Sequence, residues 1–149
     1  MRAVVQRVRR ASVLSEGRPS GTIGRGLLIL AGVESGDTDR DAEWLGKKCS
    51  ELRIFENETG RFDRSVMETG GEALVVSQFT LLGDCKRGRR PDFTAAAGPE
   101  EAEPLIEKLI ARLRASGLSV ASGVFRTSME VELINDGPVT LILDSRSGA

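Results

Sequence analysis

The chain has 149 residues, a net charge of −1, 40% hydrophobic and 29% charged residues, and neither histidine nor tyrosine. These values are typical of one globular domain that buries a core large enough to fold without disulfide bonds. Without histidine, one copy of the chain cannot form a Ser-His-Asp triad, a Cys-His pair, a histidine general base or a histidine-ligated zinc site.

The N-terminal half is predicted to contain strands, a helix and a further strand. The apolar runs that predict the strands lie, in chain order, at residues 3–8, 11–14, 27–33 and 73–79. Residues 39–52 are predicted to form the first helix, because Ala42, Leu45 and Cys49 recur at helical spacing. Turns are expected at 16–19 and 57–60, where glycine is accompanied by proline or asparagine.

The C-terminal half is predicted to begin with a long loop at 83–97, which shows no clear period. The second helix is expected to begin near Pro99 or Pro104 and to end before Gly117. The strands that follow are expected at 118–121, 130–134 and 139–143. This order predicts an α+β fold with a mostly antiparallel sheet and two packed helices, in a single domain of residues 1–149.

The compartment is indicated by the cysteines and by the apolar runs. Cys49 and Cys85 share no motif and are expected to be free thiols in a reducing environment. The start of the chain lacks a signal-peptide pattern, and the longest apolar stretch, 27–31, is far shorter than the ~20 residues that span a bilayer. We therefore expect a cytoplasmic protein that does not contact membranes.

The segment Ser77-Gln78-Phe79-Thr80 is a candidate site, because it places two hydroxyls, an amide and an aromatic ring at a strand end before a loop. Phe79 could stack on a base, and Thr80 could act as a nucleophile or a positioning group. Nearby backbone N–H groups could form an oxyanion hole. The alternative is a strand end whose hydroxyls only cap a turn.

A basic loop follows this segment, in a chain with 17 arginines and 4 lysines. It contains Lys86, Arg87, Arg89 and Arg90. Guanidinium groups bind phosphate in a bidentate manner, so a polyanion bound here would place its end near Thr80. The alternative is a solvated surface loop. No phosphate-binding glycine motif and no carboxylates at metal-ligand spacing are present, so we expect neither a metal nor a cofactor.

The segment Asn135-Asp136-Gly137-Pro138 is, from its residues alone, expected to form a hairpin turn that reverses the chain. Its Gly137–Pro138 bond is expected to be trans, since only about 5–6% of X–Pro bonds in folded proteins are cis.

Taken together, several segments occur in an order that resembles the D-aminoacyl-tRNA deacylases over nearly the whole chain. These segments are Val5–Val8, Gly26–Leu28, Arg53–Phe55, Ser77–Leu81, Arg87–Phe93 and Asn135–Thr140. The resemblance implies a curved, barrel-like sheet and a homodimer. It also implies hydrolysis of the ester between a D-amino acid, or mischarged glycine, and the 3′-terminal adenosine of tRNA, with no DNA partner.

By the same resemblance, Gly137 and Pro138 form a Gly-cisPro element that enters the pocket of the other subunit and excludes L-amino acids. Arg7 holds this element, and Met129 lies near the pocket. The tRNA is contacted by Phe79 and by the basic loop.

Catalysis is attributed by this resemblance largely to the terminal ribose 2′-hydroxyl, which assists the attack of water. Ser77, Gln78, Phe79 and Thr80 position the ester, and main-chain N–H groups near Phe79 and Thr80 stabilise the oxyanion. We favour positioning by Thr80, since no histidine or adjacent lysine can activate its hydroxyl. Two rivals remain: an RNA-binding module without chemistry, and a hydrolase of small esters that forms an acyl-enzyme on Ser77 or Thr80.

Overall fold

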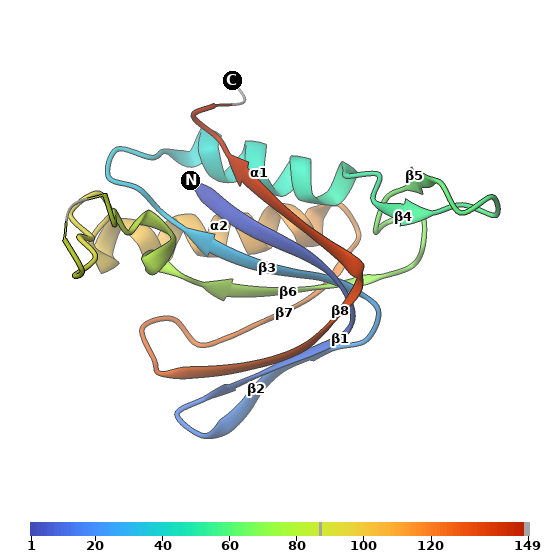
Figure 1. Ribbon diagram of the computed structural model, residues 1–149, viewed down its shortest axis with the longest axis horizontal. Coiled ribbons are helices and arrows are strands. Elements are labelled where there is room, and N and C mark those ends of the chain that lie inside the picture. Colours follow the sequence, from blue (N-terminus) through green and yellow to red (C-terminus); the bar gives the residue numbers. More distant parts are fainter. Residues whose placement is uncertain (87, 148–149) are drawn as a thin grey trace.

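A computed structural model describes residues 1–86 and 88–147. The helices within these residues are α1 (Asp39–Glu51), α2 (Pro99–Ala115) and the short 3₁₀ helix η1 (Phe79–Leu82). The strands are β1 (Arg2–Ser15), β2 (Arg18–Ile23), β3 (Gly26–Gly32), β4 (Phe55–Glu56), β5 (Phe62–Arg64), β6 (Glu72–Ser77), β7 (Ser119–Ser122) and β8 (Met129–Asp144). The two α-helices pack together on one side of a curved sheet (Figure 1). No helix in this part of the chain is long and apolar enough to cross a membrane.

The main sheet has the strand order β2-β1-β3-β6-β7, and β8 also pairs with β1. The pairs that involve β1 are antiparallel, whereas β3 with β6 and β6 with β7 are parallel. The predicted α+β class with a mostly antiparallel sheet is thus confirmed. The parallel pairs arise because α1 and α2 each return the chain to the end of the sheet at which the previous strand began. The order of elements alone does not predict these crossover connections.

The sheet curls until it is nearly closed, as the barrel-like expectation required. Residues 2–8 of β1 pair with β3, and residues 11–15 pair with β2, so one long strand joins both halves. Gly21 of β2 lies so close to β7 that a Cβ atom there would be 3.0 Å from the Ser122 carbonyl oxygen. The apolar cluster inside the curl is formed by Val8, Ala11, Val13, Ile23, Leu28, Leu74 and Val76.

A second apolar cluster lies between the sheet and the helices. Successive side chains of a strand point to opposite faces, so Leu27 and Ile29 of β3 face the helices while Leu28 faces the interior of the curl. Leu45 of α1 and Leu109 of α2 are fully buried against the same cluster. The unbroken apolar run of β3 is therefore a strand buried on both faces, as predicted.

Several predicted boundaries shift in the structure. Residues 3–8 and 11–14 belong to one strand, β1, and the strand predicted over 73–79 ends at Ser77. The second helix begins at Pro99, the earlier of the two predicted starts, and Pro104 lies inside it. Pro104 has no N–H group to donate to the Glu100 carbonyl, so α2 lacks one main-chain hydrogen bond in its second turn.

Candidate functional site

A mostly apolar pocket of about 570 Å³ opens where β6 ends. Ser77, Gln78 and Phe79 line one wall, and Met129 at the start of β8 lines another. The structure thus brings together four residues that the sequence analysis assigned to the site. It also adds residues that the sequence analysis did not assign to the site: Ile106, Phe125, Arg126 and Thr127.

The turn that follows β6 exposes main-chain donors beside this pocket. The Gln78 N–H donates to the Ala31 carbonyl at 2.8 Å, which fixes the start of η1 against β3. The N–H groups of Phe79 and Thr80 lie in the first turn of η1, where helical N–H groups lack an intrahelical acceptor. Neither has an acceptor within the described part of the chain. These two donors are suited to a developing oxyanion.

Thr80 is exposed, and its Oγ1 accepts a hydrogen bond from Gln78 Nε2. A threonine nucleophile needs a base that removes its proton. Within the described residues, Gln78 is the only side chain hydrogen-bonded to this hydroxyl, and an amide N–H₂ group cannot accept the proton. The geometry is that of a hydroxyl held in place, not of an activated nucleophile.

Phe79 lies at the mouth of the pocket with 58% of its surface exposed. Its ring makes an edge-to-face contact with Phe93, with centroids 5.3 Å apart and an angle of 69° between the planes. Such a contact fixes the orientation of the ring but leaves much of it accessible. Exposed aromatic rings of this kind stack on nucleic-acid bases.

The basic loop lies beyond η1, and paired main-chain hydrogen bonds between Asp84 and Asp92, of 2.7 and 2.9 Å, close its base. The Thr94 hydroxyl and N–H donate to the Asp92 carboxylate and lower its pKa. Lys86, Arg89 and Arg90 are exposed on this loop. Arg87, which was also assigned to tRNA binding, lies outside the described residues.

The predicted hairpin turn at Asn135–Pro138 is wrong, because β8 runs on through these residues beside β1. Val8 pairs with Asn135 and Gln6 pairs with Thr140, so Arg7 alone faces residues 136–139, which form a bulge. Asn135 Nδ2 donates to the carbonyls of Arg7 and Val139, at 3.0 and 2.9 Å, and so bridges the bulge. The Gly137–Pro138 peptide bond is cis, whereas the residues alone favoured trans.

The side chain of Arg7 is buried beneath the bulge and holds it in place, with only 4% of the side chain exposed. Its Nε donates to the Asp136 carbonyl at 3.0 Å, and its Nη1 donates to the Ile54 carbonyl at 2.6 Å. Gly137 has a φ of +117°, and a Cβ atom there would overlap with Arg7 Nη2. Gly137 and Pro138 themselves are exposed, so the bulge presents a supported tip to solvent.

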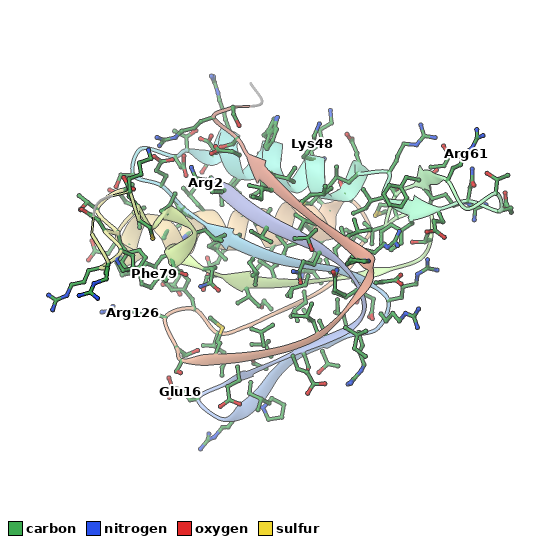
Figure 2. All side chains as sticks on the ribbon, in the orientation of Figure 1. Arg2, Glu16, Lys48, Arg61, Phe79 and Arg126 are labelled. Carbon is green, nitrogen blue, oxygen red and sulfur yellow. The ribbon has the colours of Figure 1, made fainter. Side chains whose placement is uncertain are left out.

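The predicted site residues therefore lie in two separate places. Met129 lines the pocket, and Gly137 lies eight residues further along β8. At about 3.3 Å per residue this corresponds to roughly 25 Å. Phe79 lies toward the left of the molecule in Figure 2, whereas the bend of β8 lies to the right of its centre in Figure 1. Within one chain, Arg7, Gly137 and Pro138 do not reach the pocket.

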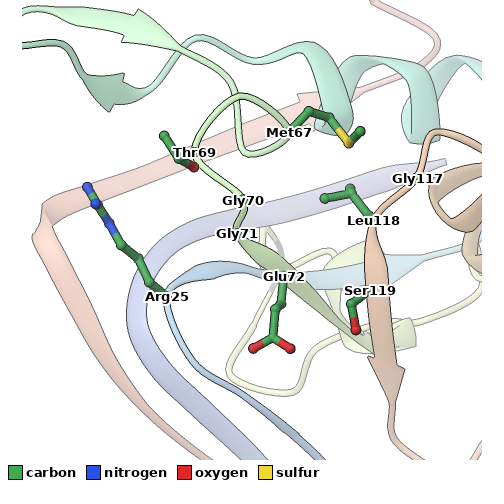
Figure 3. Close-up of a pocket in the computed structure, with 9 residues that line it drawn as sticks. All are labelled: Arg25, Met67, Thr69, Gly70, Gly71, Glu72, Gly117, Leu118 and Ser119. Atoms are coloured by element: carbon green, nitrogen blue, oxygen red, sulfur yellow. The ribbon is translucent and has the colours of Figure 1, made fainter.

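Another hollow, of about 440 Å³, lies at the opposite end of β6 (Figure 3). Glu72 in its wall accepts a hydrogen bond from the Gly24 N–H at 2.6 Å, and the Thr69 hydroxyl donates to the Ser65 and Val66 carbonyls. These polar groups serve the local backbone. The hollow contains none of the predicted site residues.

Comparison with known proteins finds a family model, curated relatives and solved structures that match nearly the whole chain. The family model described as D-Tyr-tRNA(Tyr) deacylase matches residues 4–144. A protein of Heliobacterium modesticaldum named D-aminoacyl-tRNA deacylase is 55% identical over 148 residues, which cover 99% of both chains. The solved structure of a c-Myc DNA Unwinding Element Binding Protein has a TM-score of 0.89 and 41% identity, and the match covers 97% of this chain and 98% of that one. A structure titled as a probable eukaryotic D-amino acid tRNA deacylase, at 17% identity, shares the fold with a TM-score of 0.81 over 95% of this chain and 97% of that one.

Proposed function

Since the chain belongs to the D-aminoacyl-tRNA deacylase family, we propose that its complete site combines the pocket of one subunit with the bulge of a second subunit. The protein is an ester hydrolase that releases D-amino acids from tRNA. The observation that carries the proposal is the separation, within one chain, of the pocket around Phe79 from the exposed tip at Gly137 and Pro138. A second copy supplies the missing half through a symmetric homodimer.

The pocket receives the 3′-terminal adenosine, whose base lies against the exposed ring of Phe79. The ester carbonyl then lies beside η1, where the N–H groups of Phe79 and Thr80 are free to donate to it. This arrangement fits the transition state better than the ground state, because negative charge develops on the carbonyl oxygen as water adds.

In the reaction, the oxygen of water bonds to the ester carbon, and the bond from that carbon to the ribose 3′-oxygen then breaks. The neighbouring 2′-hydroxyl assists the attack and relays a proton to the departing 3′-oxygen. The absence of histidine and the contact of the Thr80 hydroxyl with Gln78 support a mechanism in which no protein side chain moves the proton. The protein positions the ester, and the RNA supplies the group that moves the proton.

Selectivity follows from what the bulge excludes. Pro138 and the carbonyls of the bulge occupy the space that an L side chain would need, whereas a D side chain points away from them. Glycine has no side chain to exclude, so glycine mischarged on tRNA is also hydrolysed. Since aminoacyl-tRNA is used by ribosomes in the cytoplasm, we propose that the protein acts there.

The test is to incubate the protein with D-Tyr-tRNA, L-Tyr-tRNA and Gly-tRNA and to follow the release of labelled amino acid. We expect hydrolysis of the D and glycyl esters and almost none of the L ester. Equal hydrolysis of the D and L esters contradicts the proposal. Binding without hydrolysis favours an RNA-binding module, and an acylated Ser77 or Thr80 detected by mass spectrometry favours a covalent mechanism.

A further inference from the structure

Arg126 is the only charged residue among the described residues that line the pocket. It lies in the loop at 123–128 between β7 and β8, and its side chain is exposed. Figure 2 shows Arg126 at the same end of the molecule as Phe79. A guanidinium therefore stands at the mouth of a site that accepts part of a polyanion.

The backbone of Arg126 is in the left-handed region, with a φ of +60°. Glycine adopts this conformation without steric cost, whereas a residue with a side chain is strained in it. Such strain persists where the surrounding structure fixes the backbone, and it is found preferentially at functional sites. Glycine would relieve this strain, so the presence of a long charged side chain at position 126 suggests a role for that side chain.

The loop that carries Arg126 is fixed on both sides. The Val124 N–H donates to Ser15 Oγ at 3.1 Å, and the Ser128 N–H donates to Glu16 Oε1 at 2.8 Å. Within residues 1–86 and 88–147, Arg126 forms no ion pair with a carboxylate. The guanidinium is thus attached to an ordered loop and is available to an external anion, which reduces the entropy lost on binding.

We propose that Arg126 binds the phosphodiester group that joins the terminal adenosine of the tRNA to the preceding nucleotide. This inference rests on the proposed function, which places that adenosine in the pocket. The planar guanidinium matches two phosphate oxygens. It also repels the ammonium group of the aminoacyl end, so it favours the orientation in which the phosphate lies beside Arg126 and the ester lies beside η1.

The experiment uses Arg126→Gly, because glycine accepts the backbone conformation and the variant should fold at least as stably as the natural chain. Steady-state kinetics are compared on D-Tyr-tRNA and on 3′-O-D-tyrosyl-adenosine, which lacks phosphate. We expect KM for D-Tyr-tRNA to rise about tenfold or more, with kcat unchanged. Kinetics on the adenosine ester should not change, and Arg126→Lys should recover part of the loss.

A second readout is the salt dependence of tRNA binding. Loss of one phosphate contact should reduce the slope of log Kd against log salt concentration by about 1. Arg40→Ala is the matched control, because Arg40 is an exposed arginine on α1. It should leave the kinetics on both substrates unchanged.

Unchanged KM and an unchanged salt slope in Arg126→Gly would overturn the inference, while hydrolysis of D-Tyr-tRNA by the natural chain would leave the proposed function standing. An equal loss on both substrates would also overturn it, because the adenosine ester has no phosphate to bind. Failure of the natural chain to hydrolyse D-Tyr-tRNA would instead overturn the proposed function and the inference together.

Discussion

Thr80 is the residue at which two chemical mechanisms make different predictions. If the hydroxyl only positions the ester, Thr80→Ala should retain activity within about tenfold of the natural chain, because the ribose hydroxyl and the N–H donors remain. If the hydroxyl were the nucleophile, the loss would be about 10⁴-fold or more. Single-turnover hydrolysis of D-Tyr-tRNA measures the difference.

The counterpart of this variant is a tRNA that ends in 2′-deoxyadenosine. The natural protein should cleave D-Tyr-tRNA of this type far more slowly than the ribose form. Undiminished cleavage, together with inactive Thr80→Ala, would establish the covalent mechanism instead.

Pro138 is the residue that should set chiral selectivity, because it is exposed at the tip of a bulge that Arg7 supports. Pro138→Ala should retain hydrolysis of D-Tyr-tRNA and should hydrolyse L-Tyr-tRNA at least about tenfold faster than the natural chain does, since about 1.4 kcal/mol of lost exclusion has that effect. Pro19→Ala is the matched control, because Pro19 is also exposed and lies in β2. An unchanged ratio of D to L rates in Pro138→Ala would rule out the role assigned to Pro138.

The two cysteines should differ sharply in reactivity. Burial raises the pKa of the Cys49 thiol to about 12, so it stays protonated and inaccessible at pH 8, whereas Cys85 is exposed. An excess of a thiol-specific reagent should therefore label only Cys85 in the native chain and both thiols in denaturant, as counted by mass spectrometry. Labelling of Cys49 in the native protein would contradict the packing of α1.

At the scale of elements, the bulge in β8 shows where sequence reasoning fails. The residues Asn135-Asp136-Gly137-Pro138 have turn composition, and composition does not reveal that β1 lies alongside both halves of β8. Because β1 pairs with β8 on both sides of residues 136–139, these residues form a bulge and not a turn. A local sequence pattern carries no information about this long-range pairing. The resemblance to a family assigned the segment a role and a cis Gly137–Pro138 bond, which the structure has, but it did not supply the bulge in β8.

The position of the residues at the end of β6 was better predicted, for a physical reason. The apolar run that ends in Ser77 and Gln78 marks the end of a buried strand, and polar residues at such an end line a pocket. Phe79 was expected in the strand but lies in η1. The pocket walls from α2 and the loop before β8 could not be predicted, because residues such as Phe125 have no local pattern that indicates their neighbours.

The basic loop is the element that should supply sequence-independent affinity for tRNA. Arg89→Ala and Arg90→Ala should each weaken tRNA binding and reduce the salt slope by about 1, because each removes one phosphate contact. Arg114→Ala, at the end of α2, is the control. Binding and slope that do not change in the loop variants would indicate a solvated loop without a role in binding.

At the scale of the whole molecule, Asp41 links the start of α1 to the segment after β8. Burial acts to raise the pKa of this carboxyl, yet hydrogen bonds from Ser145 Oγ and from Thr38 outweigh burial and lower the pKa to about 2. Because the folded-state pKa lies below the ordinary value of 3.8, this contribution to stability is complete above about pH 4 and is lost as the pH falls through about 2.

Asp41→Asn should therefore be less stable than the natural chain at pH 7, and its stability should fall less steeply between about pH 4 and pH 2. Urea unfolding at a series of pH values measures both effects. Glu107→Gln, an exposed change on α2, should follow the natural chain throughout. A pH dependence in Asp41→Asn equal to that of the natural chain would show that folding does not lower the pKa of Asp41.

In the proposed dimer, each complete site joins the pocket of one subunit to the bulge of the other. Phe79→Ala should disable the pocket but keep the bulge, and Pro138→Ala should keep the pocket but admit L-Tyr-tRNA. In a symmetric dimer, refolding Pro138→Ala chains with a tenfold excess of Phe79→Ala chains pairs about nine-tenths of the intact pockets with an intact bulge.

The decisive measurement is the rate of L-Tyr-tRNA hydrolysis per Pro138→Ala chain, before and after this mixing. If the bulge acts across subunits, this rate should fall to roughly a tenth while hydrolysis of D-Tyr-tRNA persists. A rate of L-Tyr-tRNA hydrolysis that the excess Phe79→Ala chains leave unchanged would contradict a site shared between subunits.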